Sequence, residues 1–238
     1  MRHAYKLAAL ILAFLALQLS PASARDLAVS KGELSVEDLY KATACGADPG
    51  GPCRTEIARW PKPLRHKLRV HIRPPDAGFP EDLVKPVIAS VRLAITEINV
   101  SGSDIQLELV NDPGAPLQIH MIDAAWGDRV ADSGDPVLDS AKMRATATGL
   151  RLAPAGDAIE KASIAVSGNI APDIVRAAVL KALLRALGFR YALDNPFYTG
   201  KSVFAELGHD VFKIRRQDML ALRLQYPTGC EKASDCLK

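Results

Sequence analysis

The sequence is poor in aromatic side chains and carries little net charge. Phe, Trp and Tyr make up 5% of its 238 residues, and 30 Lys and Arg stand against 27 Asp and Glu. Proteins that bind nucleic acids or anionic membranes usually present basic patches on their surface. We therefore expect no nucleic-acid partner and no stable membrane insertion.

Long apolar runs are also missing, except for one at the start of the chain. The run "LAALILAFLALQL" at residues 7–19 follows Arg2 and Lys6 and precedes the small residues that end at Ala24. It is shorter than the ~20 residues that a transmembrane helix needs. This pattern predicts a signal peptide over residues 1–24, cleaved near Ala24. We expect an exported protein, periplasmic or secreted, whose net charge falls to +1 once Arg2 and Lys6 are removed.

Cysteine is scarce, and its even number suits an exported chain. The four cysteines are Cys45, Cys53, Cys230 and Cys236. In an oxidising compartment such a set predicts disulfides rather than thiol chemistry. We favour the local pairs Cys45–Cys53 and Cys230–Cys236, with a link between the two ends of the chain as the alternative. The spacing within each pair is too wide for a zinc ribbon.

Turn residues and hydrophobic periodicity predict one main domain with short appendages. The order of elements indicates an α+β layer domain, not a series of parallel βαβ units. We expect the following division: a signal peptide (1–24), an N-terminal extension with a cysteine loop (25–59), the main domain (60–227) and a cysteine-containing tail (228–238).

Local patterns place the individual elements. Alternating apolar residues indicate strands, and apolar residues at helical spacing indicate helices. The irregular stretch at residues 123–145 predicts a long exposed loop or a ragged sheet edge, with its aspartates hydrated. Expected helices cover 34–42 with Ser35 as N-cap, 80–99 with Pro86 inside, 171–189 with Pro172 in its first turn, and 215–226; expected strands cover 68–72, 105–110, 117–123, 146–154 and 161–168.

The segment "KALLRALGFRY" has the spacing of a zinc-protease helix without its ligands. The metzincin pattern is H-E-x-x-H-x-x-G-x-x-H, and Gly188 stands at its glycine. Protonated Lys and Arg have no lone pair for a metal ion, and Ala cannot act as a general base. We therefore expect no metal of the metzincin type at this helix, and no cofactor. The residues at the ligand and base positions are Lys181, Ala182, Arg185 and Tyr191.

Lys181 and Arg185 are four residues apart and share one face of the predicted helix. They can form a solvated polar face opposite the leucine stripe of the same helix. Alternatively, they occupy a cleft and hold an anionic ligand or a carboxylate of this chain. Glu206, Asp210 and Asp194 are the candidate partners in that case. We name Lys181 and Arg185 as the candidate ligand-binding residues.

Other potential sites are weaker. The scattered histidines do not form a recognised metal motif, and the loop aspartates lack the spacing of a calcium site. The tetrapeptide "TGKS" at residues 199–202 lacks the upstream glycine and strand of a phosphate-binding loop. The histidines considered are His66, His71, His120 and His209; the aspartates are Asp123, Asp128, Asp132, Asp135 and Asp139.

Four segments resemble an uncharacterised family of exported bacterial proteins, a domain of unknown function (DUF2927-like). They are "ARWPKPLRHKLRVHI", "KALLRALGF", "SVF" and "DMLALRLQYP", spread over roughly residues 57–227. The resemblance implies a zincin-like, degenerate metzincin-type fold: a mixed sheet with a long central helix and a C-terminal helix. The family's long helix usually carries acidic residues before a Leu-Gly-Leu turn. Here those acids are missing and Phe189 replaces the second Leu.

These features together predict a non-catalytic binding or structural domain of the cell envelope. A cleft between a sheet edge and the long helix would recognise an extended peptide or an envelope protein by adding a strand. The alternative is a peptidase-like hydrolase with a non-standard metal site outside the long helix. A third possibility is a structural protein without a ligand.

Overall fold

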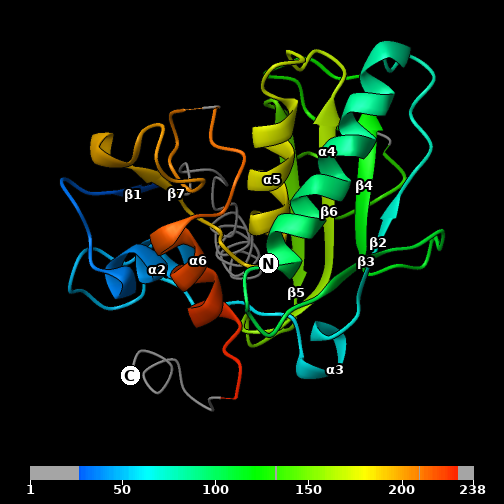
Figure 1. The fold of residues 1–238 in the computed structure, drawn as a ribbon. Helices are drawn as coiled ribbons and strands as arrows, with labels where there is room; N and C mark the ends of the chain where they lie inside the picture. The colour runs from blue at the N-terminus through cyan, green and yellow to red at the C-terminus, as the bar shows by residue number, and fades with distance from the viewer. Residues whose placement is uncertain (1–26, 132, 209, 230–238) are drawn as a thin grey trace, which may run out of the picture.

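A computed structural model describes residues 27–131, 133–208 and 210–229 and shows two layered parts (Figure 1). In the larger part, the helices α4 and α5 cover one face of a five-stranded sheet. In the smaller part, two helices, α2 and α6, lie beside a short two-stranded sheet. The elements are β1 (Leu27–Val29), α2 (Val36–Cys45), α3 (Lys62–Arg65), β2 (Leu68–Ile72), α4 (Glu81–Asn99), β3 (Leu107–Leu109), β4 (Leu117–Ile122), β5 (Thr146–Leu152), β6 (Ile159–Ser167), α5 (Val175–Ala186), β7 (Ala192–Asp194), η2 (Pro196–Tyr198) and α6 (Arg216–Gln225).

The larger sheet is mixed, which confirms the expected α+β class. Its strand order is β3-β2-β4-β6-β5, and only β5 runs antiparallel to its neighbour. We expected no series of parallel βαβ units, and the sheet contains one such unit, in which α4 connects the parallel neighbours β2 and β3. Short strands show their own periodicity but not their partners, so pairing cannot be read from local pattern.

Burial follows the position of each strand in the sheet. In β2, Leu68 and Val70 are fully buried while Arg69 between them is exposed. The central strand β4 is buried along its whole length, and β6 nearly so. Helices cover one face, and a small cluster that includes Val130, Leu138 and Met143 of the 123–145 loop covers part of the other. A strand buried on both faces must be apolar on both.

The two helices over the sheet differ from expectation in one detail. Helix α4 matches its predicted range and continues through Pro86. Helix α5 begins only at Val175, so Pro172 lies in a turn before the helix and not in its first turn. The helix ends before Gly188, whose φ of +100° is available mainly to glycine. The expected leucine stripe of α5 is buried.

The smaller part joins distant segments of the chain. Strand β1 pairs in parallel with β7, and α2 packs against α6. The side chain of Ser35 accepts a hydrogen bond from the backbone N–H of Asp38, which confirms it as the N-cap of α2. Several side chains of β1 and α2 belong to the main hydrophobic core. The described residues 27–59 are therefore packed into the fold.

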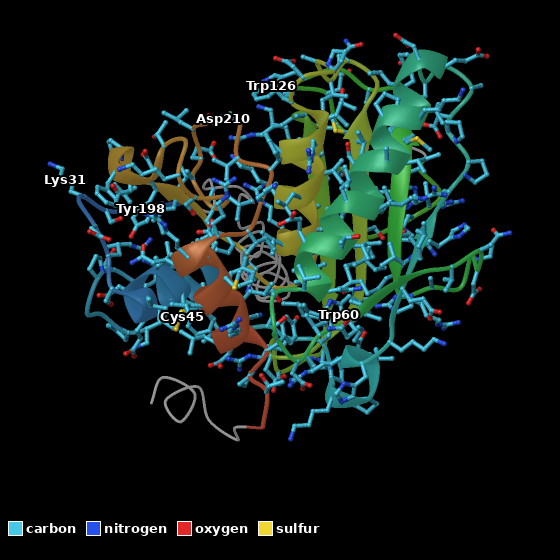
Figure 2. All side chains as sticks on the ribbon, viewed as in Figure 1. Lys31, Cys45, Trp60, Trp126, Tyr198 and Asp210 are labelled. Atoms are coloured by element: carbon cyan, nitrogen blue, oxygen red, sulfur yellow. A yellow bond between two sulfur atoms is a disulfide. The ribbon has the colours of Figure 1, made fainter. Side chains whose placement is uncertain are left out.

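One disulfide of the favoured pairing is present. Cys45, at the end of α2, is bonded to Cys53, with 5.2 Å between their Cα atoms (Figure 2). Cys230, Cys236 and the predicted signal peptide lie outside the described residues. Among the described helices, none is both long enough and apolar enough to cross a membrane.

Candidate binding cleft

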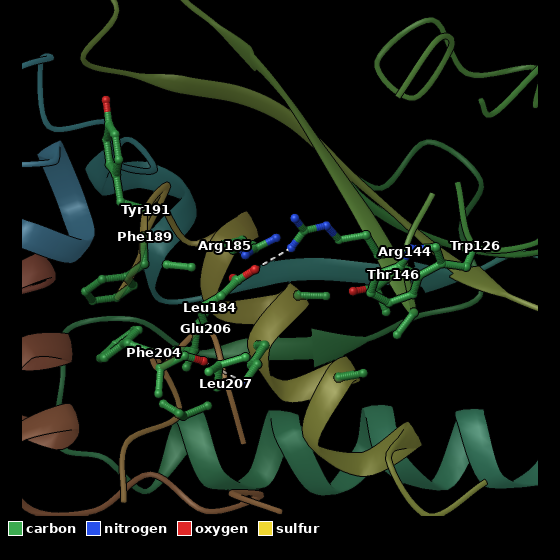
Figure 3. A pocket seen from close by; sticks show the side chains of 17 residues that line it. Trp126, Arg144, Thr146, Leu184, Arg185, Phe189, Tyr191, Phe204, Glu206 and Leu207 are labelled. Atoms are coloured by element: carbon green, nitrogen blue, oxygen red, sulfur yellow. Dashed lines mark hydrogen bonds and ion pairs between the residues drawn. The ribbon is translucent and has the colours of Figure 1, made fainter. Parts of the chain in front are cut away.

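A cleft of about 290 Å³ lies between α5, the start of β5 and the segment 203–207 (Figure 3). Its floor is apolar and is made by the alanines of α5 together with Phe189, Val203 and Phe204. The rings of Phe189 and Phe204 are 4.6 Å apart between centroids. Ala178 and Ala182 are one helical turn apart, and their small side chains leave room above the floor.

Both candidate residues, Lys181 and Arg185, line this cleft. Each is half-buried, so they do not form a solvated face. The Lys181 ammonium donates hydrogen bonds to the carbonyl oxygens of Ala205 and Gly208, both at 2.8 Å. Lys181 thereby ties α5 to the segment that forms the opposite wall.

The charge on Lys181 is disfavoured by its surroundings. Burial lowers its pKa to about 8, and the nearby guanidinium of Arg185 lowers it as well. Glu206 and Asp210 act in the opposite direction without compensating fully. Because burial is the largest cause, the lowered pKa indicates first of all that the Lys181 ammonium is poorly solvated in the cleft.

Glu206 is the carboxylate of this chain that enters the cleft. Its Oε1 lies 2.7 Å from Nη1 of Arg144, two residues before β5, and Figure 3 shows Arg185 beside this pair. Asp194, another candidate partner, lies in β7 opposite Val29 and does not line the cleft. Arg144 could not be predicted as a cleft residue, because nothing in the local sequence of a loop residue indicates which distant segment it will contact.

The rim of the cleft exposes two large apolar side chains. Trp126 is 66% exposed and Leu207 is 63% exposed. The Arg144 guanidinium lies 5.9 Å from the ring centroid of Trp126, which holds the indole at the rim. Exposed apolar groups around a concave site are typical of binding surfaces.

The edge strand β5 forms one side of the cleft. Its first residue, Thr146, and the preceding Ala145 line the cavity. Within the described residues β5 pairs with β6 alone, so no strand occupies its outer edge. Such an edge presents unpaired backbone N–H and C=O groups to a partner.

The metzincin-like spacing brings its three histidine positions to one cavity. Lys181, Arg185 and Tyr191 all line the cleft, although the Tyr191 ring points away from Arg185 (Figure 3). The Tyr191 ring packs against the backbone of Gly46. Gly188 makes the turn between them, and an added Cβ there would collide with the carbonyl of Ala58 and the side chain of Gln225.

A second polar cluster lies on the opposite side of the sheet. Asp135 is fully buried, although we expected a hydrated acidic loop, and it accepts a hydrogen bond from Ser163 at 2.7 Å. His120 Nε2 lies 3.4 Å and Lys161 Nζ 2.9 Å from Asp135 Oδ2. Burial lowers the pKa of His120. The Ser163 hydroxyl faces the carboxylate and not the imidazole, so this cluster is not a hydrolytic triad.

The other described histidines have separate surroundings and share no site. His66 is exposed beside Asp104, and His71 contacts the carbonyl of Val110. His209 lies outside the described residues. The described residues contain no group of three or more His, Cys, Asp or Glu side chains suited to a metal ion.

No protein-family model matches the chain, and no curated protein matches its sequence. The geometry of the cleft therefore carries the functional proposal.

Proposed function

We propose that this chain is a non-catalytic, zincin-like binding domain of the bacterial cell envelope that holds an extended peptide in the cleft beside α5. The resemblance to the DUF2927-like family and the predicted signal peptide support the envelope location. The mixed sheet, with β6 leading into α5 and a glycine turn after it, supports the zincin-like architecture.

The observation that carries the proposal is the position of the cleft along the open edge of β5. A peptide that adds a strand at this edge gains backbone hydrogen bonds, and the cleft beside it offers a pocket for one side chain. Trp126 and Leu207 stand at the rim as apolar contacts for the flanking residues. Strand addition needs no chemistry from the protein.

The side chains at the enzymatic positions fit binding better than hydrolysis. Lys181 is held by two carbonyl groups, and Arg185 remains protonated under all physiological conditions. Arg185 can neither ligate a metal ion nor act as a general base, and Lys181, whose pKa is lowered to about 8, is mostly protonated at neutral pH with its ammonium donating to the two carbonyls. Ala182 has no polar atom.

The proposal is tested by screening a degenerate octapeptide pool against the purified mature protein. Bound peptides are identified by mass spectrometry, resynthesised with a fluorophore and titrated by fluorescence anisotropy. Trp126→Ala and Leu207→Asp should each weaken binding about tenfold or more, since exposed aromatic and aliphatic anchors dominate such interfaces. Leu93→Asp, which changes a comparably exposed leucine on α4, should leave binding unchanged.

Backbone chemistry distinguishes strand addition from other binding modes. N-methylation at alternate peptide positions should abolish binding where the N–H faces β5 and be tolerated at the positions between. Equal tolerance at every position would contradict strand addition. Cleavage of the peptides that stops on treatment with a chelator would favour the alternative, a hydrolase with a non-standard metal site.

A further inference from the structure

The charged side chains that line the cleft already have partners within the chain. The Lys181 ammonium donates hydrogen bonds to two backbone carbonyl oxygens, both at 2.8 Å. Arg144 and Glu206 form an ion pair of 2.7 Å. Arg185 also interacts with other groups of the chain. A charged ligand group that entered the cleft would therefore lose its water and compete for partners that are already in use.

The deep part of the cleft is apolar and belongs to the main hydrophobic core. Ala178 and Ala182 of α5 are buried there together with Phe189 and Phe204. The two rings lie close together, with 4.6 Å between their centroids (Figure 3). Because core packing holds these four side chains, the shape of this surface is set before a ligand binds. Such a surface favours a ligand group that leaves water for apolar contacts.

The volume of the cleft decides how large this group is. An apolar cavity of about 150 Å³ is large enough to bind a benzene ring. The cleft holds about 290 Å³, so a whole Leu or Phe side chain fits, whereas a methyl group would leave most of the space unfilled. This space exists because α5 presents the small residues Ala178 and Ala182 to it.

A strand added at β5 can direct one side chain into this space. Successive side chains of a strand point to opposite faces of its sheet. Thr146, the first residue of β5, lines the cleft, whereas Ala147 packs in the small cluster on the other face. A peptide paired with β5 therefore turns alternate side chains toward α5, and the one beside Thr146 meets the cavity.

We propose that the cleft selects extended peptides by one bulky apolar side chain, such as Leu, Ile, Met or Phe, and that Ala178 and Ala182 set the size of this side chain. The inference rests on the proposed function. It adds the class of ligand, a peptide with one bulky apolar anchor, and the residues that determine specificity.

Peptides captured from the degenerate octapeptide pool test the inference on the unaltered protein. One position should be enriched in Leu, Ile, Met and Phe. A captured peptide is resynthesised with Phe, Leu, Ala, Glu or Lys at this position and titrated by fluorescence anisotropy. The Ala form should bind about tenfold or more weakly than the Leu and Phe forms, since it loses the burial of a large apolar side chain. The Glu and Lys forms should bind no more tightly than the Ala form.

Substitution on α5 locates the anchor. Ala178→Leu fills part of the cleft and should reduce the affinity for the Phe form to that of the Ala form, with little effect on the Ala form itself. The matched control is Ala89→Leu, the same change at an exposed position of α4, which should alter neither affinity. Melting curves show whether the variants are folded. Ala178→Val makes a smaller change in the same direction and replaces Ala178→Leu if the latter does not fold.

The outcomes separate this inference from the proposed function. Equal binding of the five forms overturns the apolar anchor and leaves peptide binding intact. Tightest binding of the Glu or Lys form overturns it as well. An unchanged preference for Phe in the folded Ala178 variant overturns the role of α5 in setting the size. Capture of no peptide from the degenerate pool overturns both proposals.

Discussion

Arg144 and Glu206 join the two walls of the cleft through an ion pair of 2.7 Å between Nη1 and Oε1. They lie 62 positions apart in the sequence, on the approach to β5 and on the segment facing α5. Both side chains are partly exposed, so the pair should contribute about 1 kcal/mol or less to stability. Its importance is electrostatic, because it sets the charge next to Lys181.

Glu206→Gln should therefore change Lys181 more than it changes stability. Glu206 raises the pKa of Lys181, which burial and Arg185 lower to about 8. Without this carboxylate the pKa should fall further, which a pH titration of ¹³C-methylated lysine by NMR would measure. The control is Glu160→Gln, which breaks an exposed ion pair with Arg151. An unchanged Lys181 titration in Glu206→Gln would contradict the described arrangement.

Gly188→Ala should destabilise the fold by about 3 kcal/mol or more. Its positive φ alone costs an alanine about 1–2 kcal/mol, and the new Cβ would collide with the Ala58 carbonyl and Gln225. Gly32→Ala is a matched control, since Gly32 also has positive φ but open space around it. Urea unfolding of the two variants compares them. Similar losses in both would show that the contact with Ala58 has no energetic role.

Asp218 should make the protein less stable as the pH rises from about 4 to 7. Burial raises its pKa from 3.8 to about 6, although hydrogen bonds from Ser202 and Val203 oppose the shift. A raised folded-state pKa stabilises the fold below the unfolded-state value and loses that contribution as the pH rises through about 6. The shift corresponds to about 3 kcal/mol.

Asp218→Asn should remove this pH dependence, because the amide resembles the protonated acid. Its stability relative to the unaltered protein should increase between about pH 4 and pH 7, as measured by urea unfolding at each pH. Asp173→Asn, at an exposed turn residue, should follow the unaltered protein at all pH values. If the free energy of unfolding of Asp218→Asn and of the unaltered protein changed with pH in the same way, burial would not raise the pKa of Asp218.

Asp135→Asn should destabilise the protein by about 3 kcal/mol, because it leaves Lys161 without its buried partner. Hydrogen bonds from Ser163 and Lys161 outweigh the burial of Asp135 and lower its pKa. The stabilisation that ionised Asp135 provides is therefore fully present above pH 3.8, its ordinary pKa. It is lost as the pH falls through the lower folded-state pKa. The exposed Asp139 of the same loop provides the control, since Asp139→Asn should change stability by less than about 0.5 kcal/mol. Urea unfolding at neutral and acidic pH measures both.

The sequence predicted those features that depend on neighbouring residues. Alternation in Leu68–Ile72 marked β2, and Ser35 marked the start of α2. It also brought Lys181 and Arg185 to one face. It did not predict the burial of Asp135, because an aspartate in a loop is hydrated unless distant residues such as Ser163 supply partners.

The set of residues that line the cleft could not be predicted from the sequence for the same reason. Trp126, Arg144 and Glu206 come from separate loops, and nothing in their local sequences indicates that they meet around α5. The order of parallel strands is likewise set by packing over long chain distances. The cleft therefore becomes visible only when the fold places these segments together, and of its lining the helix spacing pointed to Lys181 and Arg185.

The pairing of β1 with β7 has a consequence for biosynthesis. The strand partners of residues 27–29 are residues 192–194, and α2 packs against α6, which lies still later in the sequence. A polypeptide that leaves the ribosome N-terminus first cannot close this part until nearly all of it has been made. The segment that holds β1 and α2 is thus among the last described parts to fold, and it remains available to chaperones until residues 192–225 have been made.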